Sequence, residues 1–135
     1  MKIGMDWKIQ GQKVEAKFQF EVLNRDLVIS KPFGDNSKYD FITDYKGLLK
    51  RVQVKSVGTP SKFGYQCQLS STNGSKRLRY SKKDIDIFAA HIIPLDVWYF
   101  IPVEFVTAST VYLCPEGASK AKYEKFKNKW ELLKK

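Results

Sequence analysis

A β-hairpin pattern in the first half of the chain constrains the fold more than any other sequence feature. Two strand-like runs, residues 39–43 and Leu48–Val57, flank Gly47, a residue that readily adopts the backbone angles of a tight turn. In the second run, Val52 and Val54 alternate with polar residues. Because side chains alternate between the two faces of a strand, this run has one apolar and one polar face.

The polar face of the second strand carries Arg51, Gln53 and Lys55, and the first strand carries Asp40. Hairpin pairing brings Asp40 close to this face. Burying an acid, an amide and an ammonium together costs free energy unless the groups pair or bind a cation. Where they converge at a sheet edge they can hold Mg²⁺ and a water, because Mg²⁺ takes oxygen ligands and keeps several waters.

These residues also have ordinary structural interpretations. Asp40 can cap the entry to the hairpin turn, and Gln53 and Lys55 can form a solvated strand face together with Arg51. His91, the single histidine, lies between apolar residues and is better explained as a satisfied core histidine than as a catalyst.

A helix is predicted over Trp7–Leu23. In this segment Val14, Phe18 and Val22 recur at a spacing of four residues, with charged residues between them. Asn24 follows as the expected stop.

Short strands and a second helix are predicted after the hairpin. The apolar runs predict strands at residues 65–69, 85–93, 97–101 and 109–113. Residues 70–83 read as a polar, basic loop with room for one short helical turn. From residue 119 onward a stripe at helical spacing predicts a C-terminal basic helix, about residues 119–135, with the stripe formed by Tyr123, Phe126, Trp130 and Leu133. The order of elements predicts one α/β domain, residues 1–135, with a mixed central sheet.

Charge and cysteine content narrow the range of functions. The chain has 24 Lys+Arg against 14 Asp+Glu, a net charge of +10, which favours a polyanionic partner, with nucleic acid ahead of a membrane surface. Cys67 and Cys114 lie far apart and cannot build a tetrahedral zinc site with a single histidine. With no apolar signal region and no long apolar run, we expect no membrane span and a reducing, cytoplasmic location.

Basic side chains crowd one segment of the predicted loop, where Tyr80 stands among Lys76, Arg77, Arg79, Lys82 and Lys83. A solvated basic surface is the ordinary explanation. Added to the net charge of +10, the cluster favours contact with phosphates.

Two runs of sequence, PFGDNSKYDFI at residues 32–42 and RVQVKS at residues 51–56, resemble the PD-(D/E)-x-K nuclease superfamily. They are most similar to the branch of group I intron homing endonucleases in which glutamine takes the place of the central acid. The resemblance extends over residues 11–23, where family members carry a glutamate on the first helix and this chain has Glu15, and more weakly over residues 80–106.

The resemblance implies a role for each matching residue. Asp40 would be the main metal-binding carboxylate, and Glu15 a second one from the helix. Gln53 would offer its side-chain oxygen and Val54 its main-chain carbonyl. Lys55 would orient or help to deprotonate the attacking water and offset charge on the pentavalent phosphate. Glu15 can equally be an ordinary surface acid of the helix.

The same resemblance implies a restriction-endonuclease-like core, about residues 6–113, and a DNA endonuclease that depends on Mg²⁺, with Mn²⁺ as a substitute. The chain departs from the family pattern at two places: Tyr39, not proline, precedes Asp40, and residues 69–85 lack the pattern of a second core helix. Lys38 and Arg51 join the basic segment as expected contacts to double-stranded DNA.

The expected activity is that of a site-specific homing enzyme. Because each chain offers one active site, cutting both strands calls for at least a homodimer. Two alternatives remain open, namely a junction-resolving or repair nuclease on the same core, and a non-catalytic basic protein that binds nucleic acid.

Overall fold

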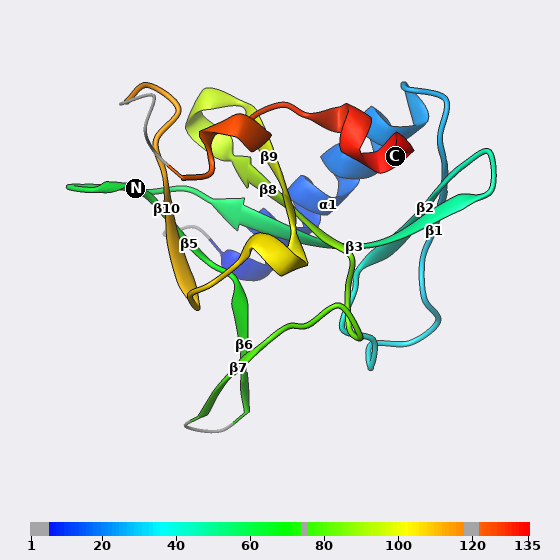
Figure 1. Ribbon diagram of the computed structural model, residues 1–135, viewed down its shortest axis with the longest axis horizontal. Helices are drawn as coiled ribbons and strands as arrows, with labels where there is room; N and C mark the ends of the chain where they lie inside the picture. The colour runs from blue at the N-terminus through cyan, green and yellow to red at the C-terminus, as the bar shows by residue number, and fades with distance from the viewer. Residues whose placement is uncertain (1–5, 74–75, 118–121) are drawn as a thin grey trace.

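A computed structural model describes residues 6–73, 76–117 and 122–135, and for residues 71–73 and 76–78 it describes the backbone only (Figure 1). Helix α1 spans Trp7–Leu23, as the residue spacing predicts. The Asp6 carboxylate caps its start by accepting a hydrogen bond from the Lys8 N–H at 2.8 Å. The buried face of the helix consists of Gln10, Val14, Phe18 and Val22.

The predicted hairpin is formed by β2 (Phe41–Tyr45) and β3 (Leu48–Val57), which pair antiparallel. In the turn Lys46 and Gly47 both have positive φ, 51° and 94°, a pair of angles that matches the twist of the flanking strands and that glycine adopts without strain. Strand β2 begins later than predicted, so Asp40 lies just before the strand and not within it.

The hairpin belongs to a five-stranded sheet with the order β1-β2-β3-β8-β9. Strands β3 and β8 run parallel, and the other neighbours are antiparallel. The added strands are β1 (Val28–Ser30), β8 (Ile87–Ile92) and β9 (Val97–Pro102). Every residue of β8 is buried, as expected for a strand that is covered on both faces. A mixed sheet packed against an N-terminal helix confirms the predicted α/β class.

Two smaller antiparallel sheets complete the strands. One has the order β10-β5-β4, and the other pairs β6 with β7; the bounds are β4 Pro60–Ser61, β5 Gly64–Gln68, β6 Ser70–Asn73, β7 Lys76–Arg79 and β10 Thr110–Leu113. The prediction of a loop across β6 and β7 was wrong, because main-chain pairing forms a hairpin from a polar run with no apolar alternation to reveal it. The short turn predicted in the same segment is present, since the Asp84 N–H donates to the Ser81 carbonyl at 2.9 Å.

Both faces of the five-stranded sheet are covered. On one face, α1 and the end of the chain pack in a cluster that includes Phe18, Phe41 and Leu133. On the other face, the three-stranded sheet packs in a cluster that includes Phe88 and Leu113 (Figure 1). The five-stranded sheet therefore lies between two apolar layers.

The predicted C-terminal basic helix is not formed over residues 122–135. The segment contains two short 3₁₀ turns, Glu124–Phe126 and Trp130–Lys134. Between them Asn128 has a positive φ of 55°, and its N–H donates to the Trp98 carbonyl at 2.6 Å while its side-chain oxygen accepts from the Trp98 N–H at 3.0 Å. Pairing with the outer edge of β9 therefore replaces the hydrogen bonds that would continue a helix.

The aromatic stripe predicted for that helix is consequently divided. Tyr123 and Phe126 join the core on one face of the central sheet, whereas Trp130 and Leu133 join the core on the other. The segment crosses the edge of the sheet and closes both cores. In the part of the chain that the structure describes, no helix is long and apolar enough to cross a membrane.

Candidate active site

The start of β2 leaves one edge of β3 without a strand partner, and Asp40 fills this position. The Asp40 N–H donates to the Val52 carbonyl at 2.8 Å, and the Asp40 carboxylate accepts from the Val54 N–H at 2.8 Å. The side chain thus stands in for the next main-chain acceptor. Because the N–H and C=O of a strand residue point to the same side, the Val54 carbonyl also faces the edge that Asp40 occupies.

Glu15 on α1 lies close enough to Asp40 for the two carboxylates to repel each other. Burial is the main cause that raises the pKa of both groups, and the charge of Asp40 raises the pKa of Glu15 further. The Val54 N–H and the ammonium groups of Lys55 and Lys31 lower the pKa of Asp40 without cancelling the effect of burial. Two partly buried carboxylates in this state are stabilised when a divalent cation joins them.

Gln53 is buried on the opposite face of β3 from Val52 and Val54. Its Nε2 donates to the Lys38 carbonyl at 2.8 Å and to the Tyr80 hydroxyl at 2.9 Å. Its Oε1 is buried and accepts no hydrogen bond from any described residue. An unpaired buried acceptor is unfavourable, so this oxygen is suited to a cation or to a water that a cation holds.

Lys55 shares the face of β3 that carries Gln53. Its ammonium lies 5.8 Å from the centre of the Tyr80 ring and is close enough to Asp40 to lower the pKa of that carboxyl. In the structure the charge of Asp40 therefore interacts with the charges of Glu15 and Lys55. Gln53 is hydrogen-bonded to Lys38 and Tyr80.

Sequence reasoning missed two residues of this site, Lys31 and Tyr80. Lys31 follows β1 directly, and the pairing of β1 with β2 places its ammonium 5.9 Å from the Phe41 ring and near both carboxylates. The pairing of β1 with β2 is the signal that would have revealed it. Tyr80 stood in the basic segment, but nothing in the sequence indicated that the end of β7 reaches Gln53.

The donor set fits a hard divalent cation such as Mg²⁺. It offers two carboxylates, the unpaired amide oxygen of Gln53 and the main-chain carbonyl of Val54, all of them oxygen ligands. Among the described residues no group of three or more His, Cys, Asp or Glu side chains could hold a metal ion. A cation held by these two acids would take its remaining ligands from neutral oxygens and water.

Arg51, predicted to contact DNA, directs its guanidinium at the turn formed by residues 81–84 and at Asp86. It donates to the carbonyls of Lys82 and Lys83 at 2.6 and 2.8 Å and to the Asp86 carboxylate at 3.2 Å. These bonds hold the turn at residues 81–84 against β3. Because four hydrogen bonds already engage its guanidinium, Arg51 acts as a structural clamp, and a contact with DNA stays a prediction.

Four of the other predicted DNA contacts are exposed, namely Lys38, Arg79, Lys82 and Lys83. Lys38 and Lys82 each make one exposed ion pair, with Asp84 at 3.1 Å and with Glu104 at 2.8 Å. The Arg79 guanidinium donates to the Val106 carbonyl at 2.6 Å, and Lys83 is exposed. The side chains of Lys76 and Arg77 lie outside the described residues, although the backbone places both in β7.

His91 is buried and stacks on Trp98 with 4.4 Å between ring centres. Its Nε2 bonds to the Asp96 carboxylate at 2.9 Å, whereas its Nδ1 has no partner among the described residues. Burial lowers its pKa in spite of Asp96. The ring thus belongs to the core, as predicted, with one nitrogen left unpaired.

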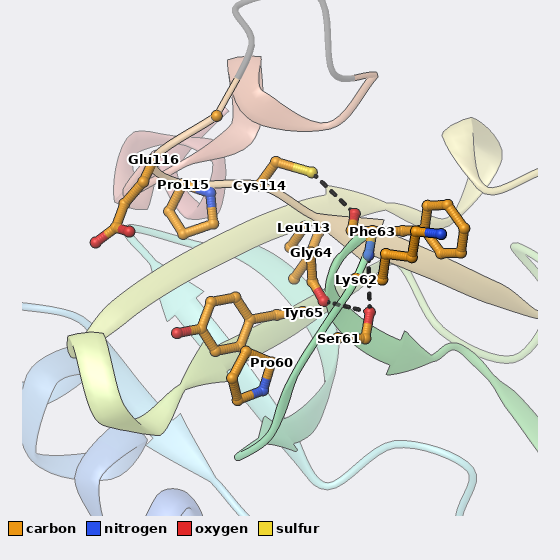
Figure 2. A pocket seen from close by; sticks show the side chains of 11 residues that line it. Pro60, Ser61, Lys62, Phe63, Gly64, Tyr65, Leu113, Cys114, Pro115 and Glu116 are labelled. Atoms are coloured by element: carbon orange, nitrogen blue, oxygen red, sulfur yellow. Dashed lines mark hydrogen bonds between the residues drawn. The ribbon is translucent and has the colours of Figure 1, made fainter.

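A pocket of about 450 Å³ lies away from these groups, between the β4–β5 hairpin and the residues after β10 (Figure 2). Figure 2 shows the Cys114 thiol directed at the Phe63 carbonyl, with 3.5 Å between sulfur and oxygen. The pocket contains none of the predicted site residues. Its lining does not suggest a reaction.

Comparison with known proteins agrees with this geometry. The sequence model of the family described as PD-(D/E)XK endonuclease matches residues 5–133. A solved structure of a bacterial homing endonuclease, I-Ssp6803I, is similar with a TM-score of 0.85 and 25% sequence identity, over 96% of this chain and 93% of that chain. No curated protein sequence matches significantly. The structural likeness confirms the predicted restriction-endonuclease-like core.

Proposed function

The chain belongs to the PD-(D/E)XK endonuclease family, and we propose that it is a Mg²⁺-dependent, site-specific DNA endonuclease of the homing type. The observation that carries the proposal is the pair of partly buried carboxylates, Glu15 and Asp40. The buried, unpaired amide oxygen of Gln53 on β3 supports it. The similarity to a bacterial homing endonuclease over nearly the whole chain supports the biological class.

We assign the roles as follows. Asp40 and Glu15 would hold the cation, with Gln53 Oε1 and the Val54 carbonyl as neutral ligands. The cation, when bound, supplies Lewis-acid stabilisation of the negative charge that develops on the phosphate. Lys55 orients the attacking water through its ammonium and offsets charge on the phosphoryl oxygens.

DNA binding is assigned to the basic residues around the β6–β7 hairpin. Lys38, Lys82 and Lys83 are exposed at one end of the five-stranded sheet, close to the turn that Arg51 holds. Lys76 and Arg77 extend the same charge along β7. We infer that at least two copies act on one duplex, because each copy carries one cation site and the duplex has two strands to cut.

Cleavage of DNA tests the assignment of residues. We expect the parent protein to cut plasmid DNA with Mg²⁺ or Mn²⁺ and to be inactive in EDTA. The Asp40→Asn and Lys55→Ala variants should each lower the cleavage rate at least a hundredfold while DNA affinity stays within about twofold, because these groups act in the transition state. Asp35→Asn and Lys13→Ala, at exposed positions that are not among the proposed site residues, are the matched controls.

The products separate the remaining possibilities. One defined cut site in a randomised DNA library supports a homing enzyme, and preferential cutting of four-way junctions would replace it with a junction-resolving enzyme. Undiminished cleavage in EDTA, or a parental rate for Asp40→Asn, would overturn the proposed site. Tight DNA binding with no cleavage under any metal would leave a non-catalytic binding protein.

A further inference from the structure

Gln53 holds a buried amide whose orientation is fixed by its surroundings. Its Nε2 donates one hydrogen to the Lys38 carbonyl at 2.8 Å and the other to the Tyr80 hydroxyl at 2.9 Å. A main-chain carbonyl has no hydrogen to donate, so the atom facing Lys38 must be the amide nitrogen. Both donors of the amide are therefore used, and the orientation is determined by chemistry.

This orientation leaves the side-chain oxygen of Gln53, Oε1, buried and without a hydrogen-bond donor among the described residues. Two well-placed bonds on the nitrogen thus hold an oxygen in an unfavourable, unpaired state. A buried acceptor in this state is satisfied by a water or by a bound ion.

Tyr80 is itself held firmly. Its ring packs against Phe88 in an edge-to-face arrangement with 5.8 Å between ring centres, and the Lys55 ammonium lies 5.8 Å from the centre of the same ring. The preceding residue, Arg79, anchors the end of β7 by donating to the Val106 carbonyl at 2.6 Å. One tyrosine therefore contacts both polar side chains of the β3 face that we place in the active site.

The same contacts discriminate between glutamine and glutamate. A glutamate at position 53 would set a carboxylate oxygen against the Lys38 carbonyl, and neither oxygen has a hydrogen to share. The Tyr80 hydroxyl could turn and donate to one carboxylate oxygen, but the Lys38 carbonyl could not. The local structure accepts a neutral amide and rejects the acid.

We propose that Tyr80 and the Lys38 carbonyl form a lock that orients Gln53, so that its Oε1 is presented to the cation and only glutamine suits the position. The role of Oε1 as a cation ligand rests on the proposed function. Tyr80 acts through Gln53 and is a positioning residue.

The lock is tested first without metal or DNA, by NMR of the Gln53 side-chain amide protons. In the parent protein both protons should exchange slowly with solvent, because both are bonded and buried. In Tyr80→Phe, which keeps the ring, one proton should lose at least tenfold in protection while the other keeps its bond to Lys38. Tyr112→Phe is the matched control, since Tyr112 lies on β10, where its ring packs against Phe63.

Metal binding is then measured by calorimetry with Mg²⁺ and Mn²⁺ alone. Tyr80→Phe should weaken binding about three- to tenfold and lower kcat for cleavage, with DNA affinity unchanged. Gln53→Glu should bind Mg²⁺ no more tightly than the parent and should melt at a lower temperature, in spite of its added negative charge. A merely structural tyrosine would lower the melting temperature of Tyr80→Phe without changing amide protection.

The outcomes distinguish the lock from the function it serves. If the parent binds no metal and cuts no DNA, the proposed function and the cation role of Oε1 both fail, whatever the amide protons show. If the parent binds Mg²⁺ and cuts DNA, the lock is overturned by unchanged amide protection in Tyr80→Phe. It is equally overturned by a Gln53→Glu variant that melts like the parent and binds Mg²⁺ more tightly.

Discussion

The two carboxylates, Glu15 and Asp40, predict that metal binding raises the thermal stability of the protein. The Asp40→Asn variant tests this prediction. Burial raises the pKa of Glu15 and of Asp40 above their unfolded values, and the charge of Asp40 raises the pKa of Glu15 further. For a carboxyl group, a raised pKa means that the charged form is less favourable in the folded state than in the unfolded state. At neutral pH, where both groups are charged, the pair therefore destabilises the fold, and acidification through the folded pKa relieves this cost.

Two opposite effects on the melting temperature follow. In the absence of metal, Asp40→Asn should melt at a higher temperature than the parent, because it removes one buried charge and can still accept the Val54 N–H through its amide oxygen. In the presence of metal, the parent gains stability that the variant lacks. With Mg²⁺ at about 100 times its dissociation constant, binding stabilises the folded state by about 2.7 kcal/mol.

The expected shift in melting temperature is this free energy divided by the entropy of unfolding, which scales with chain length. From average per-residue values, a chain of 135 residues has an unfolding entropy of about 0.28 kcal/mol/K near its midpoint. The expected rise in the parent melting temperature on adding Mg²⁺ is therefore about 10 °C, with little or no rise for Asp40→Asn.

Differential scanning calorimetry at pH 7.5, with and without Mg²⁺, measures both effects. Asp35→Asn serves as the matched control, because Asp35 is exposed in the loop before the site. It should respond to Mg²⁺ as the parent does. An Asp40→Asn protein that melts below the metal-free parent, or that gains as much stability from Mg²⁺ as the parent, would refute the reasoning.

Two further predictions concern DNA binding and pH. Replacing Lys76 and Arg77 together by alanine should weaken DNA binding and flatten the dependence of log affinity on log salt by roughly one unit per lost phosphate contact. DNA affinities measured at four salt concentrations test this, with Lys13→Ala as the control. An unchanged slope would place β7 away from DNA. Burial lowers the pKa of His91, so this residue contributes stability above its unfolded pKa of about 6.5, and the contribution is lost as pH falls from there through the lower folded pKa. Between pH 7.5 and 5 the melting temperature should therefore fall more steeply for the parent than for His91→Gln. Parallel curves for the two proteins would contradict this prediction.

Local sequence patterns were sufficient for the elements that position the site. The four-residue spacing of Val14, Phe18 and Val22 predicted α1, and alternation around Gly47 predicted the β2–β3 hairpin. These predictions succeeded because a helix face and a hairpin are each formed by residues near one another in sequence. The same hairpin placed Asp40 beside the Val54 N–H.

Long-range contacts explain the predictions that failed. The stripe from Tyr123 to Leu133 has helical spacing, but Asn128 bonds to Trp98 on the edge of β9 and sends the two halves of the stripe to opposite faces of the sheet. Helix propensity is a weak preference, and a strand edge with unpaired main-chain groups outweighs it. No periodicity within the segment indicates that such an edge lies nearby.

The sequence by itself therefore determined the hairpin, the helix and the residue types of the candidate site, because spacing and side-chain chemistry are local properties. Only the tertiary structure decided which groups surround each of those residues. It bonded Arg51 to the turn at residues 81–84, brought Lys31 near the carboxylates, and placed Tyr80 and the Lys38 carbonyl against the amide of Gln53. These contacts join residues on separate strands and loops, and they exist only once both cores have closed around the sheet.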